Sequence, residues 1–228
     1  MTPDLFSQDL FSEDARSWRE DLCPGALVLR NSVQPREASL LAALDDITDA
    51  APLRHLVTRG GFRMSVAMTN CGDYGWWSDR SGYSYTRIDP LTGKAWPAMP
   101  KVFRELAKNA AASAGFDNFE PDACLINRYA PGARLSLHQD KNERDFSQPI
   151  VSVSLGLPAT FLFGGLQRTD KSQRVLLTHG DVVVWGGEAR LRFHGVAALK
   201  SRGKPEEKPG IHPQLDECRI NLTFRKAG

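Results

Sequence analysis

Two histidines and one aspartate in this chain have the residue types and the spacing of metal ligands. His138 and Asp140 stand two positions apart in an alternating segment, and side chains at that spacing point to the same side of a strand. We interpret residues 190–194 as a second alternating strand, which carries His194 on its polar face. Two imidazoles and a carboxylate leave the opposite side of a metal open, as in non-heme Fe(II) oxygenases that admit a co-substrate and dioxygen. The three residues are therefore predicted to bind a metal ion and to be catalytic, although a hydrogen-bonded His–Asp pair with an unrelated histidine is an alternative that this short spacing leaves open.

The C-terminal segment 219–225 alternates polar and apolar residues, and its polar face begins and ends with an arginine. At a rise of about 3.3 Å per residue, the Cα atoms of Arg219 and Arg225 lie roughly 20 Å apart. On a strand facing water two arginines are ordinary, but inside a barrel their guanidinium groups need anionic partners. Because the planar fork of arginine suits carboxylates, a short dicarboxylate of five carbons has the size and the charge to lie between them.

The sequence resembles the AlkB family of Fe(II)- and 2-oxoglutarate-dependent dioxygenases, and above all its bacterial members. The resemblance runs from about residue 20 to the end of the chain and is interrupted mainly near 200–212. The matching segments are SVAMTNCGDYGW (65–76), IDPLTGKAWPAMP (88–100), PDACLINRYAPGARLSLHQDKNE (121–143), IVSVSLGLPATFLFGGL (150–166), HGDVVVWGGEARLRFHG (179–195) and CRINLTFRKAG (218–228).

The same pattern of residues indicates the fold class. Apolar periodicity predicts one helix that starts near Pro35 and includes Leu40 to Ile47, and a second helix over 99–114. From residue 121 onward, short alternating or apolar runs separated by turn residues predict strands. We expect an all-β core with flanking helices (α+β), and the resemblance implies a double-stranded β-helix, or jelly roll, with an N-terminal helical part. Residues 1–20 are predicted to be a flexible N-terminal extension, and 21–228 a single dioxygenase domain.

Residues 54–87 combine positive charge with aromatic rings and glycines. The segment holds five arginines and two aspartates, and six of the twenty aromatic residues of the chain. Arginines suit phosphates and rings suit bases, so the segment fits a single-stranded or flipped-out nucleotide, although packing in a core explains such aromatics equally well. The resemblance implies that 54–87 is a nucleotide-recognition lid in which Trp76 stacks on the base opposite His138, while Tyr83 and Tyr85 contact the nucleotide.

Further residue roles are implied by the resemblance alone. Asn127, Tyr129 and Asn221 join Arg219 and Arg225 in binding 2-oxoglutarate. Arg168, in GGLQRTD, corresponds to an arginine near the substrate base.

One position departs from the family pattern. Bacterial members commonly have HQDKDE, whereas this chain has HQDKNE, so Asn142 stands where a base-contacting aspartate is expected. An asparagine still accepts a hydrogen bond from an exocyclic amine, but it lacks the negative charge that attracts a cationic methylated base. The preference between methyladenine and methylcytosine is therefore open.

The resemblance implies oxidative demethylation with Fe(II), 2-oxoglutarate and dioxygen. 1-Methyladenine or 3-methylcytosine in DNA would lose its methyl group as formaldehyde, while 2-oxoglutarate would become succinate and carbon dioxide. The methyl group lies on the pairing edge of the base, so the nucleotide must be flipped from a duplex or already be single-stranded. RNA stays open as a further substrate, since stacking and flipping require no particular sugar.

Composition sets broad limits only. Twenty-nine basic and twenty-seven acidic residues give a formal net charge of +2. This charge does not by itself indicate a nucleic-acid partner. Four widely spaced cysteines without a CxxC pair favour reduced thiols over a zinc site or a disulfide scaffold. No leader or membrane-spanning stretch is evident, so we expect a cytoplasmic monomer without membrane contact.

Two other functions remain open from the sequence. An iron and 2-oxoglutarate hydroxylase acting on proteins or small metabolites would share the triad and the arginine pair, and only the 54–87 lid argues against it. A non-enzymatic nucleic-acid-binding β-domain would bind its ligand without metal-dependent turnover of 2-oxoglutarate. The presence of all three metal ligands and both arginines argues against that second alternative.

Overall fold

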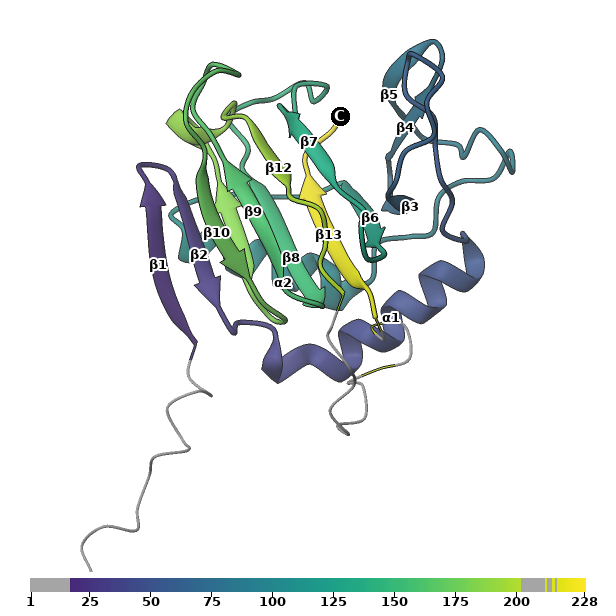
Figure 1. Ribbon diagram of the computed structural model, residues 1–228. Coiled ribbons are helices and arrows are strands. Elements are labelled where there is room, and N and C mark those ends of the chain that lie inside the picture. Colours follow the sequence, from purple (N-terminus) through teal and green to yellow (C-terminus); the bar gives the residue numbers. More distant parts are fainter. Residues whose placement is uncertain (1–16, 202–211, 213–214, 216) are drawn as a thin grey trace, which may run out of the picture.

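The computed structural model describes residues 17–201, 212, 215 and 217–228 of the chain. Its largest element is an antiparallel sheet of seven strands (Figure 1). In sheet order these strands are β1 (Trp18–Cys23), β2 (Ala26–Arg30), β11 (Val182–Trp185), β8 (Ile150–Gly156), β13 (Arg219–Arg225), β6 (Ala123–Tyr129) and β3 (Ala67–Gly72).

A second antiparallel sheet of four strands faces the first. In sheet order these strands are β10 (Gln173–Leu177), β9 (Ala159–Phe163), β12 (His194–Val196) and β7 (Leu135–His138). Trp185 of the large sheet and Phe161 and Phe163 of the small sheet are buried in one apolar cluster between the two sheets. Two antiparallel sheets that enclose such a core form the jelly roll that the sequence predicted.

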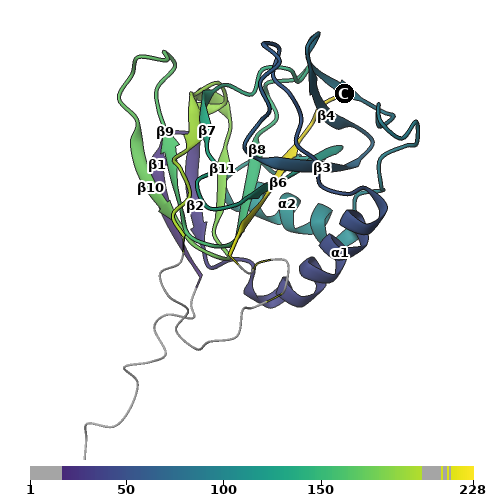
Figure 2. The same ribbon diagram turned by 45° about the vertical axis from the view of Figure 1, so that its right-hand side comes forward.

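Two helices cover the outer face of the large sheet (Figure 2). They are α1 (Glu37–Ala50), which follows the short 3-10 helix η2 (Gln34–Arg36), and α2 (Lys101–Ser113). Both helices confirm the predictions from apolar periodicity. Leu40 and Leu44 of α1 and Phe103 of α2 are fully buried, and they share a second apolar cluster with the apolar residues of β13. The large sheet therefore has a covered outer face, and its inner face is available to polar side chains.

A two-stranded hairpin stands beside the sheets and carries most of the aromatic residues of the predicted lid. Its strands are β4 (Gly75–Asp79) and β5 (Gly82–Thr86). The predicted lid, 54–87, also includes β3, which pairs with β6 as the edge of the large sheet. The six residues of β3 are all buried, so this part of the segment is fixed in the sheet, and the lid boundaries stay a prediction.

The predicted N-terminal extension also needs a correction. Residues 18–20 already belong to β1, which pairs with β2 in the large sheet, so the predicted boundary at residue 20 is too late. Residues 1–16 of that extension, and 202–211 of the stretch where the family resemblance is interrupted, lie outside the described residues. Among the described residues, no helix is long and apolar enough to cross a membrane.

Candidate metal centre

The three predicted metal ligands meet on the small sheet at the end of β7 and the start of β12. Nε2 of His138 lies 3.7 Å from Asp140 Oδ1, and Nε2 of His194 lies 3.6 Å from Asp140 Oδ2. One ligand atom from each residue falls within 4.8 Å of the others, which is close enough for all three to bind one ion. The strands bring them together because His138 and His194 are direct partners in the antiparallel register of β7 and β12.

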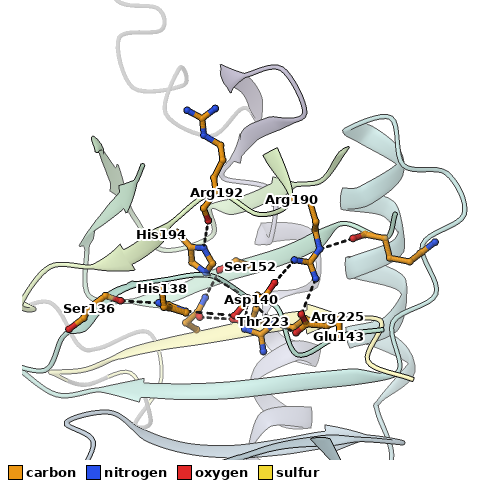
Figure 3. Close-up of polar contacts among 12 residues, drawn as sticks. Ser136, His138, Asp140, Glu143, Ser152, Arg190, Arg192, His194, Thr223 and Arg225 are labelled. Carbon is orange, nitrogen blue, oxygen red and sulfur yellow. Dashed lines mark hydrogen bonds and ion pairs between the residues drawn. The ribbon is translucent and has the colours of Figure 1, made fainter. Parts of the chain in front are cut away.

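Both imidazoles are oriented by their own backbone (Figure 3). Nδ1 of His138 lies 2.9 Å from the carbonyl oxygen of Ser136, and Nδ1 of His194 lies 3.1 Å from that of Arg192. A carbonyl oxygen only accepts hydrogen bonds, so each Nδ1 carries the proton and each Nε2 presents a lone pair to the centre. Burial, followed by the electrostatic effect of the neighbouring His194 ring, lowers the pKa of His138 to about 4, which keeps the His138 ring neutral at neutral pH.

The structure does not contain the predicted strand over 190–194. The 3-10 helix η3 (Gly187–Ala189) and a turn precede it, and His194 is the first residue of β12. Arg192 therefore does not share a strand face with His194. The next residue, Gly195, allows β7 to approach, because a Cβ atom there would lie 2.7 Å from the carbonyl oxygen of Leu135.

Arg225, at the end of β13, holds the carboxylate of Asp140. Its Nε and Nη2 donate to Asp140 Oδ2 at 2.9 and 2.7 Å, and both side chains are buried. Burial by itself raises the pKa of Asp140, but Arg225 and then His194 outweigh it and hold that pKa well below its usual range. Asp140 is therefore ionised, with one oxygen fixed by arginine and the other facing His138.

Arg219, at the other end of β13, is buried without an anionic partner. Its side chain lies over the ring of Tyr129 at 5.1 Å, and Nη2 donates to Ser154 Oγ at 3.0 Å. Its Nε and Nη1 are buried and have no hydrogen-bond partner within the described chain. Burial lowers the pKa of Arg219, but an arginine remains charged near neutral pH. A buried cation with two free donors requires an anion, and a carboxylate fits its planar fork.

The other residues predicted to bind 2-oxoglutarate line the same face of the large sheet. Tyr129 is the direct register partner of Arg219, and Asn127 is the partner of Asn221. Asn221 donates from Nδ2 to Ser152 Oγ and to the carbonyl oxygen of Val153. Its oxygen accepts a hydrogen bond from the hydroxyl of the neighbouring Thr223. The amide of Asn221 is thus committed to the protein, and its part in binding 2-oxoglutarate stays a prediction.

The predicted nucleotide-contacting residues lie on or near the hairpin. Trp76 and Tyr83 stack across β4 and β5 with ring centroids 5.5 Å apart. Tyr85, the register partner of Trp76, is partly buried, and its hydroxyl donates to Glu143 at 2.7 Å, so its contact with a nucleotide stays a prediction. Arg168 is exposed, and its Nη1 donates to the carbonyl oxygen of Leu137, next to the metal ligand on β7. Asn142 is exposed two residues after Asp140.

Sequence reasoning missed a buried ion pair behind the metal ligands. Arg190 donates from Nη2 to Glu143 Oε2 at 3.1 Å and from Nη1 to the carbonyl oxygen of Asp140 at 2.8 Å (Figure 3). Through the hydroxyl of Tyr85 the same carboxylate joins the hairpin to the metal centre. The sequence offers no signal for this pair, because 47 positions separate its members.

Comparison with known proteins places this centre in a family. The model of the 2OG-Fe(II) oxygenase superfamily matches residues 25–225. The alpha-ketoglutarate-dependent dioxygenase AlkB of Escherichia coli K12 is 56% identical over 220 residues, which cover 96% of this chain and 98% of that protein. The chain belongs to the AlkB family of 2OG-Fe(II) oxygenases. In the AlkB family it is also 33% identical to the DNA N(6)-methyladenine demethylase ALKBH1C of Arabidopsis thaliana, over 68% of this chain and 38% of that protein.

A solved structure supports the same assignment of the AlkB fold. The structure of OsALKBH1 superposes with a TM-score of 0.74 at 29% identity, covering 91% of this chain and 99% of that one. The chain is thus an Fe(II)- and 2-oxoglutarate-dependent dioxygenase. Its residues fit both groups, because the triad offers two imidazoles and one carboxylate, and Arg219 has free donors for a carboxylate.

Proposed function

We propose that this dioxygenase removes methyl groups from 1-methyladenine and 3-methylcytosine in DNA, as a direct-reversal repair enzyme. The oxidation is supported most by Arg219, whose buried guanidinium has no anionic partner and lies on the strand whose other end holds the metal ligand Asp140. The same strand, β13, therefore offers a site for a dicarboxylate and orders the metal centre. The observation that supports a nucleic-acid substrate is the aromatic hairpin with the arginines of 54–87 around it, and the name of the Arabidopsis relative, a DNA demethylase, agrees with it.

The chain's own residues would bind and orient both co-substrates. The guanidinium of Arg219, which has unpaired donors, would bind the distal carboxylate of 2-oxoglutarate, and the buried Tyr129 and Asn127 lie beside it on β6. Arg225 keeps Asp140 ionised and restricts its rotation, so that the carboxylate remains a ligand throughout turnover. His138, Asp140 and His194 would hold the iron, which supplies the chemistry of dioxygen activation when it is bound.

The reaction inserts one oxygen atom of dioxygen into a C–H bond of the N-methyl group, and the other oxygen atom enters succinate. 2-Oxoglutarate loses carbon dioxide and supplies the two electrons that the insertion requires. The N-hydroxymethyl product then breaks its C–N bond, and its hydroxyl proton is lost as formaldehyde leaves. The restored base keeps the nitrogen electron pair.

Access to the methyl group requires the base to leave a duplex, because N1 of adenine and N3 of cytosine lie on the pairing edge. Trp76, on the partly buried side of the hairpin, offers a ring on which the extruded base can stack. Methylation blocks pairing and thus lowers the cost of extrusion, which contributes selectivity. Single-stranded DNA needs no extrusion and should be the better substrate, while turnover of RNA stays a prediction.

Incubation with Fe(II), 2-oxoglutarate and a methylated oligonucleotide tests the proposal. We expect formaldehyde and succinate in equal amounts, and neither product from His138→Ala. His212→Ala is the matched control, since His212 pairs with Asp45 of α1, away from both the metal centre and the predicted lid. Formaldehyde release that survives loss of His138 would refute the metal assignment. Succinate that is formed equally with unmethylated DNA would refute the substrate.

A further inference from the structure

Of the three metal ligands, Asp140 alone lies outside the strands. His138 ends β7 and His194 begins β12, and the register of these two strands holds both histidines in place. Asp140 lies beyond the end of β7, in residues 139–149, which we call the ligand loop. The structure describes all of this loop and assigns no part of it to a helix or a strand. Contacts from other segments must therefore fix the backbone of Asp140.

The buried side chain of Arg190 holds the ligand loop at three points. Its Nη1 donates to the carbonyl oxygen of Asp140 at 2.8 Å, and its Nη2 donates to Glu143 Oε2 at 3.1 Å (Figure 3). Its Nε donates to the carbonyl oxygen of Gln148 at 2.9 Å, and the guanidinium lies over the ring of Phe146 at 5.4 Å. One side chain thus fixes both ends of the ligand loop, and its burial strengthens these hydrogen bonds.

Arg190 belongs to the segment that carries another metal ligand. It lies four residues before His194, in the turn that follows η3. Its neighbour Leu191 accepts a hydrogen bond at its carbonyl oxygen from Nε2 of Gln139, at 2.6 Å. The ligand loop and the turn that leads to His194 are therefore joined by donors from both sides. These contacts set how the carboxylate of Asp140 and the imidazole of His194 lie relative to each other.

Arg190 also affects which carboxylate Arg225 binds. Nε of Arg225 donates to Asp140 at 2.9 Å and lies 3.6 Å from Glu143 Oε1, so two buried carboxylates face one guanidinium. The charge of Arg190 neutralises Glu143 and leaves Arg225 to Asp140. Without Arg190, the buried carboxylate of Glu143 would lack its partner and would attract Arg225, which loosens the hold of Arg225 on the metal ligand.

From these contacts we infer that Arg190 is a positioning residue of the metal centre. It acts through the backbone of Asp140, which it holds directly, and through the charge of Glu143, which it neutralises. Both effects orient the carboxylate of Asp140 before a metal ion binds, so both contribute to metal affinity. The inference concerns the metal centre alone, and it does not depend on the nucleic-acid substrate of the proposed function.

The test measures the Kd of the metal-free full-length protein for Co(II) by isothermal titration calorimetry, without 2-oxoglutarate or nucleic acid. We expect Arg190→Met to raise this Kd about tenfold, as for other losses of a partner that orients a metal ligand. Arg30→Met is the matched control, since Arg30 of β2 forms ion pairs with Glu20 and Asp181, and two strands separate β2 from β13. The control should lower the urea midpoint of unfolding and leave the Kd for Co(II) unchanged.

Two further variants separate the backbone contacts from the charge, and they carry the test if Arg190→Met does not fold. Arg190→Lys keeps a charge beside Glu143, but a single ammonium cannot hold the carbonyl oxygens of both Asp140 and Gln148. Arg190→Met/Glu143→Gln also loses the backbone contacts, and it leaves no second carboxylate to attract Arg225. Each of these two variants should raise the Kd for Co(II) only about threefold.

Three results would overturn the inference. One is a wild-type Kd for Co(II) in both Arg190→Lys and the double variant. Another is a rise in Arg30→Met as large as that in Arg190→Met, which would assign the loss to a less stable fold. The third is a Kd in the double variant as high as in Arg190→Met, or tenfold above wild type where Arg190→Met does not fold, which would exclude the competition for Arg225.

Discussion

The metal centre and the hairpin are built in opposite ways. Around the metal centre, His194 and both arginines of β13 are buried on paired strands of two sheets, Asp140 is buried just after β7, and hydrogen bonds hold Asp140 and His194 in place. The hairpin has only two strands, and Tyr83, Arg80 and the neighbouring Phe62 are exposed. The core of the fold thus fixes the oxidation chemistry, whereas the substrate is selected by a surface that can change without disturbing that core. Changes in the two regions should separate the kinetics of 2-oxoglutarate from those of the oligonucleotide.

The largest difference between the effects on the two KM values is expected from Arg219→Gln. The change removes the charged donors for the distal carboxylate, so the KM for 2-oxoglutarate should rise about 100-fold while the KM for the oligonucleotide stays constant. Folding stability should not fall, because in the ligand-free protein this cation is buried without an anion. Arg128→Gln, an exposed change on neighbouring β6, is the control, and an equal rise of both KM values would contradict the assignment.

Trp76→Ala should change the KM for the oligonucleotide and not the KM for 2-oxoglutarate, and its effect should be smaller. Loss of one stacking surface should raise the KM for a methylated oligonucleotide about tenfold, with the KM for 2-oxoglutarate unchanged. Steady-state kinetics with each substrate varied in turn measures both values. Trp18→Ala, an exposed tryptophan on β1, controls for the loss of an indole. A rise in the KM for 2-oxoglutarate would show that the hairpin and the metal centre are not independent.

Asn142→Asp should change the rate of demethylation by only a few-fold. The added carboxylate stands at an exposed position, where its attraction for a cationic methylated base is worth about 1 kcal/mol or less. We expect faster turnover of both methyladenine and methylcytosine oligonucleotides, with an altered ratio between them, in side-by-side rate measurements. Identical rates in the variant and the wild type would remove Asn142 from the set of substrate contacts.

The smallest expected effect is on stability against pH in the metal-free protein. The folded state lowers the pKa of His138 from 6.5 to about 4. Between these values the unfolded chain binds more protons, so stability that is present above about pH 6.5 should be lost as the pH falls toward about 4. Urea unfolding with a chelator present measures this loss, and His138→Asn should flatten it. An unchanged slope in the variant would assign the loss to another group.

The regular parts of the fold could be predicted from the sequence because local patterns determine them. Alternation in β13 places Arg219 and Arg225 on one face, and Ile220, Leu222 and Phe224 are buried on the other as predicted. The spacing of His138 and Asp140 likewise follows from one short segment. The prediction of a strand over 190–194 was wrong. Alternation of polar and apolar residues does not distinguish a strand from the turn that follows the 3-10 helix η3.

Contacts between distant segments could not be predicted. The Arg190–Glu143 pair and the direct pairing of His138 with His194 depend on the strand order of the small sheet, which no local pattern encodes. The hydrogen bond of Tyr85 has the same origin, because its partner Glu143 lies 58 residues away. The resemblance to a family supplied roles for the two histidines and for Tyr85, but it supplied neither a role for the Arg190–Glu143 pair nor the contacts that support the other residues.

A crystal structure of the protein grown without oxygen, with Fe(II) and 2-oxoglutarate, tests the central claim most directly. We predict iron bonded to His138, Asp140 and His194, and the distal carboxylate of 2-oxoglutarate hydrogen-bonded to the guanidinium of Arg219. Iron bound elsewhere would contradict this claim, as would a 2-oxoglutarate that leaves Arg219 without an anion.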